Sequence, residues 1–159
     1  MKLFFLRHGL AADRREWKGS DAERPLTKDG MERMKRSAAM IAGLGLELDA
    51  ILSSPLTRAR QTASIVAEAL DAQNKLLVDG RLGAGFDKDA LAEILRDHAS
   101  SESLMLVGHE PGLSATISAL IGGGRIMCKK GGLVCVNLPE PASLQGELLW
   151  LIPPRILAL

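Results

Sequence analysis

The sequence predicts an α/β domain built on a mostly parallel sheet. Short apolar runs alternate along the chain with segments whose apolar residues recur at helical spacing. The chain has 159 residues, enough for one domain with a hydrophobic core, and nothing in it resembles an interdomain linker. Since 47% of the residues are hydrophobic, we expect a single globular domain over residues 1–159.

The first part of the chain contains a strand, a long loop and a helix. The run Lys2–Leu6 is short and apolar, as in strands that are buried on both faces. The stretch Ala11–Pro25 is polar and is predicted to form a loop over the sheet edge, and loops of this length are often functional. Thr27 is expected to cap a helix that runs to about Gly43.

The second part repeats the alternation of strands and helices. A strand is expected at Ala50–Ser53, and Ser54 followed by Pro55 predicts the start of a helix that runs to about Leu70. The remaining predicted elements are a strand at Lys75–Val78, a loop at Asp79–Phe86, a helix capped by Asp87, a strand at Ser103–Val107, a helix from Gly112 to about Ile121, and an antiparallel pair of strands at Leu133–Leu138 and Glu147–Ile152.

Composition excludes several classes of partner. The net charge is +1, so we expect no general attraction to nucleic acid or to an anionic membrane, and aromatic residues make up only 3%. The two cysteines, Cys128 and Cys135, do not form a disulfide framework, which indicates a reducing compartment. The apolar run before Arg7 is too short for a signal peptide or a membrane helix. We therefore expect a cytoplasmic protein that binds neither nucleic acid nor membrane.

Three predicted strand-to-helix junctions carry cationic or titratable side chains. Arg7 and His8 follow the first strand, Arg58 lies in the first turn of the helix after the second strand, and His109 follows the strand at residues 103–107. The carboxyl ends of parallel strands meet at one edge of a sheet, so these side chains can converge on one pocket. Two arginines and two histidines suit a dianion, because arginine binds phosphate through a two-pronged hydrogen bond and stays charged.

Such a pocket could transfer a phosphoryl group without a metal. A neutral imidazole can attack phosphorus, and a phosphohistidine intermediate divides the reaction into two easier steps. The remaining cationic groups would stabilise the charge on the equatorial oxygens. No cluster of His, Cys and Asp has the spacing of metal ligands, so we expect neither a metal nor another cofactor.

Three motifs in this chain resemble those of the histidine phosphatase superfamily, which includes cofactor-dependent phosphoglycerate mutases and acid phosphatases. They are Leu-Arg-His-Gly at residues 6–9, Ser-Pro-x-x-Arg-Ala-x-Gln-Thr-Ala at 54–63, and Gly-His-Glu at 108–110, in the order that the family shows. The resemblance implies a three-layer α/β/α fold of the phosphoglycerate mutase type. It also implies that His8 is the catalytic nucleophile, and that Arg7, Arg58 and His109 form a catalytic pocket that binds the phosphoryl group.

The shortness of the chain and the segment Arg24-Pro25-Leu26-Thr27-x-x-Gly30 resemble the small phosphohistidine phosphatases of the SixA type. That group removes phosphate from histidine on the phosphotransfer proteins of bacterial signalling relays. The implied partner is therefore a phosphorylated phosphotransfer protein.

One feature of the larger family members is missing from this chain. They carry an acidic proton donor in an insertion after the second helix, whereas the corresponding residues here, 78–83, offer only Asp79 beside Arg81. Asp13 and Glu110 are further weak candidates for the acid. An alkoxide leaving group without a positioned acid would leave roughly 100- to 10,000-fold more slowly. Solvent can protonate a phosphorylated imidazole near neutral pH, so the missing acid favours a P–N substrate.

Two alternatives stay open at this point. One is a phosphatase of the same chemistry that acts on a small phosphorylated metabolite, for which a closed pocket with additional cationic groups would be expected. The other is a module that binds phosphate or a phosphoprotein without turnover. The sequence also leaves open whether Arg24 reaches the pocket rim, and whether Lys129 and Lys130 face a phosphoprotein or form a solvated turn.

Overall fold

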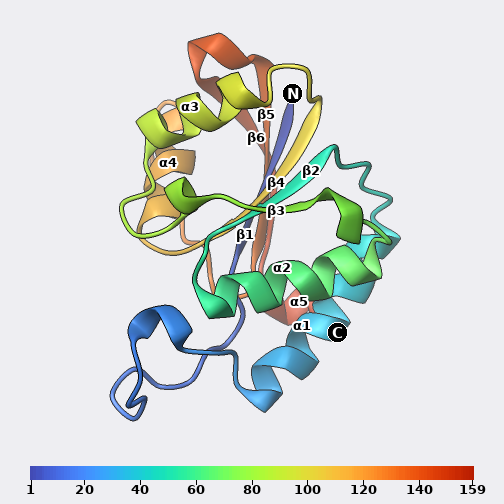
Figure 1. Cartoon of the computed structure of the whole chain (residues 1–159). Coiled ribbons are helices and arrows are strands. Elements are labelled where there is room, and N and C mark those ends of the chain that lie inside the picture. The colour runs from blue at the N-terminus through green and yellow to red at the C-terminus, as the bar shows by residue number, and fades with distance from the viewer.

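In the computed structural model, which describes all residues from 1 to 159, six strands form one central sheet (Figure 1). The strands are β1 (Lys2–Arg7), β2 (Ala50–Ser53), β3 (Leu76–Val78), β4 (Ser103–Gly108), β5 (Leu133–Glu140) and β6 (Gln145–Ile152). Their order across the sheet is β3-β2-β4-β1-β5-β6. The pairs within the first four are parallel, while β5 runs antiparallel to both β1 and β6. The predicted mostly parallel sheet with an antiparallel final pair is confirmed.

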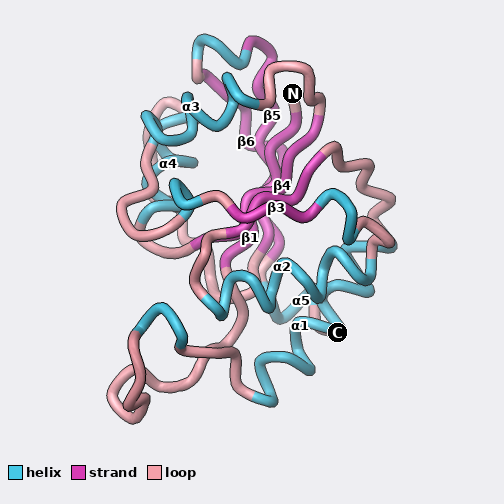
Figure 2. The backbone as a smooth tube through the Cα atoms, viewed as in Figure 1, coloured by secondary structure: helices cyan, strands magenta, loops and turns pink.

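Helices cover both faces of this sheet. They are α1 (Lys28–Gly43), α2 (Thr57–Ala69), α3 (Lys88–Asp97), α4 (Gly112–Leu120) and α5 (Pro154–Leu157). Figures 1 and 2 show α1, α2 and α5 on one face and α3 and α4 on the other. The expected three-layer α/β/α arrangement is confirmed. None of the helices is both long enough and apolar enough to cross a membrane.

The side chains of the central strands alternate between two hydrophobic clusters, one on each face. Phe5 packs into the cluster under α3 and α4, whereas Phe4 and Leu6 pack into the cluster under α1 and α2. This alternation is the period of two expected for a strand that is buried on both faces. The last buried positions of β1 therefore hold the backbone rigidly where Arg7 and His8 follow.

Local signals explain several of the helix boundaries. The Thr27 hydroxyl accepts a hydrogen bond from the Gly30 backbone N–H at 2.9 Å, and the Asp87 carboxylate accepts one from Ala90 at 2.9 Å. Both side chains cap the helices that the sequence predicts for them. Gly30 also lies directly against the Leu10 carbonyl oxygen, which a Cβ at this position would strike. The start of α1 is thereby brought against the chain that follows His8.

The predicted start of the second helix is wrong. Ser54 and Pro55 were expected to begin it, but α2 begins at Thr57 with Leu56 as its N-cap. The Ser54 hydroxyl accepts a 3.3 Å hydrogen bond from the Leu56 N–H and makes a 2.7 Å hydrogen bond to a distant side chain, His109. A tertiary contact thus competes with the local capping role of the serine.

Other boundaries differ in smaller ways. The predicted loops contain single turns of 3-10 helix at residues 21–23 and 80–82, and residue Lys75 belongs to a further turn at 73–75 rather than to β3. The hairpin strands β5 and β6 each extend about two residues further toward their connection than predicted. Helix α5 is not predicted from the sequence, because its four residues are too few to show helical periodicity.

Candidate active site

Backbone hydrogen bonds join the three strand-to-helix junctions at one edge of the sheet. Strand β4 lies between β1 and β2, with Arg7 level with Gly108 and Ser53 level with Val107. Just beyond the strands, the N–H of His8 donates to the Gly108 carbonyl at 3.1 Å. The N–H of Ser54 donates to the Val107 carbonyl at 2.9 Å. The predicted convergence of strand ends is therefore built into the sheet itself.

His8 is buried, with 5% of its surface exposed. Its Nδ1 lies 2.8 Å from the Gly9 carbonyl oxygen, which can only accept a hydrogen bond, so Nδ1 carries the proton in the neutral ring. The lone pair is then on Nε2. Burial lowers the pKa of His8 to about 3, although the bond to Gly9 opposes this, and the charges of His109, Arg58 and Arg7 lower it further. The ring is consequently neutral at physiological pH, which is the form in which an imidazole can attack as a nucleophile.

His109 faces His8, and their ring centroids are 5.1 Å apart. Its Nε2 makes the 2.7 Å hydrogen bond to the Ser54 hydroxyl, while its Nδ1 is buried without a partner. Burial and the charge of Arg58 lower the pKa of His109 to about 4. When the Ser54 hydroxyl donates to Nε2, the free Nδ1–H becomes a donor toward an incoming group.

Arg58 projects from the first turn of α2 and is bound to the loop before α1. It donates to the Asp21 backbone carbonyl at 2.8 Å and to the Asp21 carboxylate at 3.0 Å. The same carboxylate accepts a 3.0 Å hydrogen bond from Arg24, which also donates to the Ala12 carbonyl at 2.8 Å. Arg24 therefore lies at the rim of the site, which answers the question that the sequence left open.

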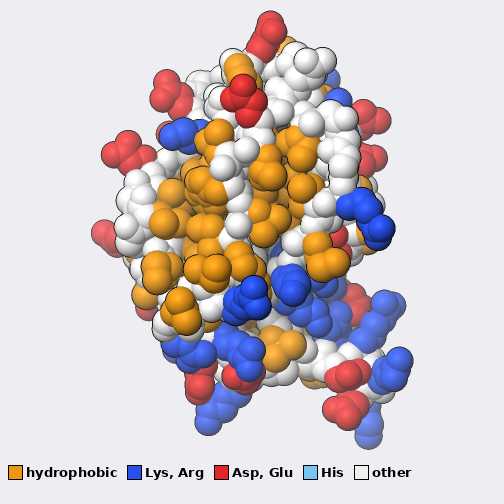
Figure 3. Space-filling view, turned by 180° about the vertical axis from the view of Figure 1, so that it is seen from behind, with side chains coloured by type: hydrophobic (Ala, Val, Ile, Leu, Met, Phe, Trp, Pro, Cys, Tyr) orange, Lys and Arg blue, Asp and Glu red, His pale blue; other side chains and the backbone are white.

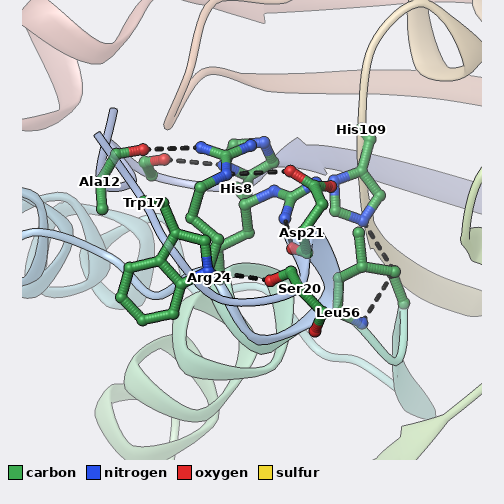
Figure 4. A network of polar contacts seen from close by, with 11 residues as sticks. His8, Ala12, Trp17, Ser20, Asp21, Arg24, Leu56 and His109 are labelled. Atoms are coloured by element: carbon green, nitrogen blue, oxygen red, sulfur yellow. Dashed lines mark hydrogen bonds and ion pairs between the residues drawn. The ribbon is translucent and has the colours of Figure 1, made fainter. Parts of the chain in front are cut away.

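The loop that carries Asp21 is folded on itself. Trp17 donates through its indole N–H to the Ser20 carbonyl at 2.9 Å (Figure 4). The Ser20 hydroxyl donates to Glu23 at 2.9 Å. Partial burial acts to raise the pKa of Asp21, but the hydrogen bond from Arg24 and the charge of Arg58 lower it overall. Asp21 is thus an ionised carboxylate in contact with the arginine that was expected to bind phosphate.

Several donors in this site have no partner. Arg7 donates through one terminal nitrogen to the Cys128 carbonyl at 2.8 Å, but its Nε is buried and unpaired. The Nε of Arg58 and the Nδ1 of His109 are in the same state, so this site holds three of the five buried side-chain atoms that lack a partner. Buried polar groups are normally paired, and unpaired nitrogens on Arg7, Arg58 and His109 fit an anion with several oxygens.

None of the acids proposed from the sequence makes a side-chain hydrogen bond to Arg7, His8, Arg58 or His109. Asp79 binds Arg81, whose hydrogen bonds lower the pKa of the carboxyl, and Glu110 accepts a 2.8 Å hydrogen bond from the Ser114 hydroxyl. Asp13 accepts from the Arg15 N–H in the loop. No group of three or more His, Cys, Asp or Glu side chains lies together in a way that could hold a metal ion.

Sequence reasoning missed two residues of the site, Ser54 and Asp21. Ser54 carried a strong helix-start signal that concealed its contact with His109. Asp21 is one of several charged residues in a loop without periodicity. The length of the loop was the only signal that could have indicated a function.

Comparisons with known proteins agree with this geometry. The family model of the histidine phosphatase superfamily (branch 1) matches residues 3–82. An uncharacterized protein of Picosynechococcus sp. is 39% identical over 98% of both chains. The phosphohistidine phosphatase SixA of Escherichia coli is 27% identical over 97% of this chain and 94% of its own. The structure of the protein histidine phosphatase SixA complexed with tungstate matches with a TM-score of 0.87 at 27% identity, over 99% of both chains. The chain belongs to the histidine phosphatase superfamily and is a phosphatase of that superfamily.

Proposed function

We propose that this phosphatase removes the phosphoryl group from phosphohistidine on a signalling phosphotransfer protein, through a covalent intermediate on His8. The observation that carries the proposal is the state of His8: a buried, neutral ring whose Nδ1 is held by Gly9 and whose Nε2 is free. Similarity to the SixA proteins supports the choice of substrate.

In the first step Nε2 of His8 attacks phosphorus in line with the departing nitrogen. The P–N bond of the substrate breaks, a P–N bond to His8 forms, and the departing imidazole takes its proton from solvent. Arg7, Arg58 and His109 would bind the equatorial oxygens through the donors that now lack partners. In the second step water attacks the phosphorylated His8, and inorganic phosphate and the free ring are released.

The carboxylates of the site favour a leaving group that needs no protein acid. Asp21 is the acidic side chain in contact with Arg58, and its pKa is lowered, so it is ionised at neutral pH and cannot donate a proton. An alkoxide would lack a proton donor there. A departing imidazole needs no proton donor from the protein, because its unperturbed pKa of about 6.5 lets solvent supply the proton.

Rapid acid-free quenching after reaction with a ³²P-phosphohistidine peptide tests this mechanism. We expect the wild-type protein to carry label on His8 and to release inorganic phosphate, and the His8→Ala variant to do neither. The matched control is His98→Ala, which removes a histidine at the end of α3 outside the site and should retain label and turnover. Full turnover by His8→Ala would refute the mechanism, and phosphate binding without label would indicate a binding module.

Hydrolysis of a small phosphomonoester is the second candidate, and two observations favour it. His8 is almost fully buried, and Arg24 adds a cation at the rim. Comparing kcat/KM for the phosphohistidine peptide with that for phosphoserine and 4-nitrophenyl phosphate separates the two candidates. We expect the peptide to be the better substrate, and a higher kcat/KM for either ester would support the second candidate instead.

A further inference from the structure

A cavity of about 580 Å³ opens beside the active site, between α1, α5 and the turn at residues 129–131. Arg7 and Gly9, the two neighbours of His8 in the chain, form part of its wall. Gly131 donates its backbone N–H to the carbonyl oxygens of Arg7 and His8, at 3.0 and 3.1 Å. The cavity is therefore attached to the backbone that positions the nucleophile.

The lining of this cavity is strongly basic. Its cationic residues come from β1, α1, the turn and α5, and they are Arg7, Arg33, Arg36, Lys129, Lys130 and Arg155. One acid, Asp29, lies among them, and it forms an ion pair with Arg33 at 2.8 Å. None of the other five cationic residues forms an ion pair. This local excess of positive charge contrasts with the net charge of the whole chain, which is only +1.

Like charges held together repel one another, so this arrangement weakens the fold unless an anion accompanies it. Arg36 donates to the backbone carbonyl of Ala158 at 3.2 Å, which holds α5 against α1, but Lys129, Lys130 and Arg155 are exposed to solvent. Structural anchoring of α5 accounts for Arg36, whereas the side chains of Lys129, Lys130 and Arg155 make no hydrogen bond or ion pair within the protein.

An apolar hollow adjoins the basic cavity and shares Lys129 with it. The hollow has a volume of about 100 Å³ and includes Met127, which is 70% exposed, and Leu151 of β6. Viewed from behind, Lys and Arg side chains gather directly below a broad apolar area (Figure 3). A basic surface beside exposed apolar side chains suits a protein partner better than a small ion, because protein interfaces combine apolar cores with charged rims.

We propose that this basic cavity docks an acidic segment of the phosphorylated protein substrate, next to its phosphohistidine. This proposal rests on the proposed function, and it specifies that the protein substrate carries negatively charged residues next to its phosphohistidine. A phosphohistidine inserted at His8 brings the flanking residues of the partner to Arg7 and Gly9, where the cavity begins. An extended segment of six residues spans about 20 Å, which is long enough to follow the cavity toward α5.

Two ³²P-phosphohistidine peptides of equal length test the docking site, one with six glutamates beside the histidine and one with six glutamines. At low ionic strength we expect the wild-type protein to show a kcat/KM about tenfold higher for the acidic peptide. In the K130E/R155E variant the ratio of kcat/KM for the acidic peptide to kcat/KM for the glutamine peptide should fall to about one. The matched control is K88E/R96E, the same change of charge on α3 across the sheet, which should keep the preference.

Each result has one meaning. Equal kcat/KM for both peptides with the wild-type protein, or an undiminished preference in K130E/R155E, would overturn the docking site while leaving the proposed function intact. Hydrolysis of the glutamine peptide by K130E/R155E serves as the check that this variant is folded. Failure of the wild-type protein to hydrolyse either peptide, while it hydrolyses 4-nitrophenyl phosphate, would overturn the proposed function and the docking site with it.

Discussion

We predict that Asp21 competes with the substrate for Arg58. Its carboxylate accepts hydrogen bonds from Arg58 and Arg24, two cations of the site, while the Nε of Arg58 has no partner. A phosphoryl dianion that binds Arg58 must displace this carboxylate or share the arginine with it. We therefore expect Asp21→Asn to bind phosphate more tightly than the wild-type protein, because the amide keeps the shape of the side chain and removes the charge.

The structure sets the size of this effect. Both ion pairs of Asp21 have N···O distances of 3.0 Å, and its side chain is 40% exposed. Ion pairs that reach solvent contribute about 0.2–1 kcal/mol each, and the bond from Arg58 to the Asp21 backbone carbonyl survives the substitution. A net gain of about 1 kcal/mol corresponds to an inhibition constant for phosphate that is about fivefold lower.

Competitive inhibition of 4-nitrophenyl phosphate hydrolysis by inorganic phosphate measures this constant directly. The matched control is Asp87→Asn, which makes the same change of charge at the N-cap of α3 and retains a capping side chain. We expect the control to leave the inhibition constant unchanged. An inhibition constant that rises in Asp21→Asn would refute the competition and would show that the carboxylate instead orients Arg58 for phosphate.

Three further predictions concern the site and its support. Ser54→Ala leaves the His109 ring without its hydrogen bond, and we expect kcat to fall about tenfold with partial rescue by Ser54→Thr, measured by steady-state kinetics. The lowered pKa values of His8 and His109 mean that between about pH 4.5 and 6 only the unfolded chain takes up their protons. These two groups should therefore lower the free energy of unfolding by up to about 2.7 kcal/mol for each pH unit of acidification. In urea titrations at several pH values, the free energy of unfolding of His8→Gln should fall less steeply with decreasing pH. Gly30→Ala should lower the free energy of unfolding by about 2–3 kcal/mol because its Cβ strikes a backbone carbonyl, whereas Gly43→Ala, with open space around it, should not lower it in the same titration.

The residues that were expected to gather in the site do so because their placement depends on strand ends. Arg7 and His8 follow a buried strand, and His109 follows its parallel neighbour in the sheet. Once the strands are recognised as parallel, their carboxyl ends must share one edge, and Arg58 enters with the first turn of α2. This much follows from short apolar runs and from the residues next to them.

The contacts made by these residues could not be predicted in the same way. Ser54 has the sequence context of a helix cap, and its hydrogen bond to His109 depends on a residue 55 positions further along the chain. The partner of Arg58 depends on the path of the loop over residues 11–25, which is set by the bond from Arg24 to the Ala12 carbonyl and by the Ala12–Pro25 backbone bond. Nothing local distinguishes Asp21 from the other acids of that loop.

The sequence by itself determined the alternating strands and helices, the mostly parallel sheet and the identity of the groups around the candidate site, because periodicity, caps and strand ends are properties of neighbouring residues. The three-layer arrangement was implied by the resemblance to the histidine phosphatase superfamily. Only the tertiary structure decided which nitrogen of His8 is free, which carboxylate lies against Arg58, and that cations from four separate segments line one cavity beside His8. These features arise where segments distant in the sequence meet. Their free energies depend on burial and on the distance between charges, and neither can be deduced from the order of neighbouring residues.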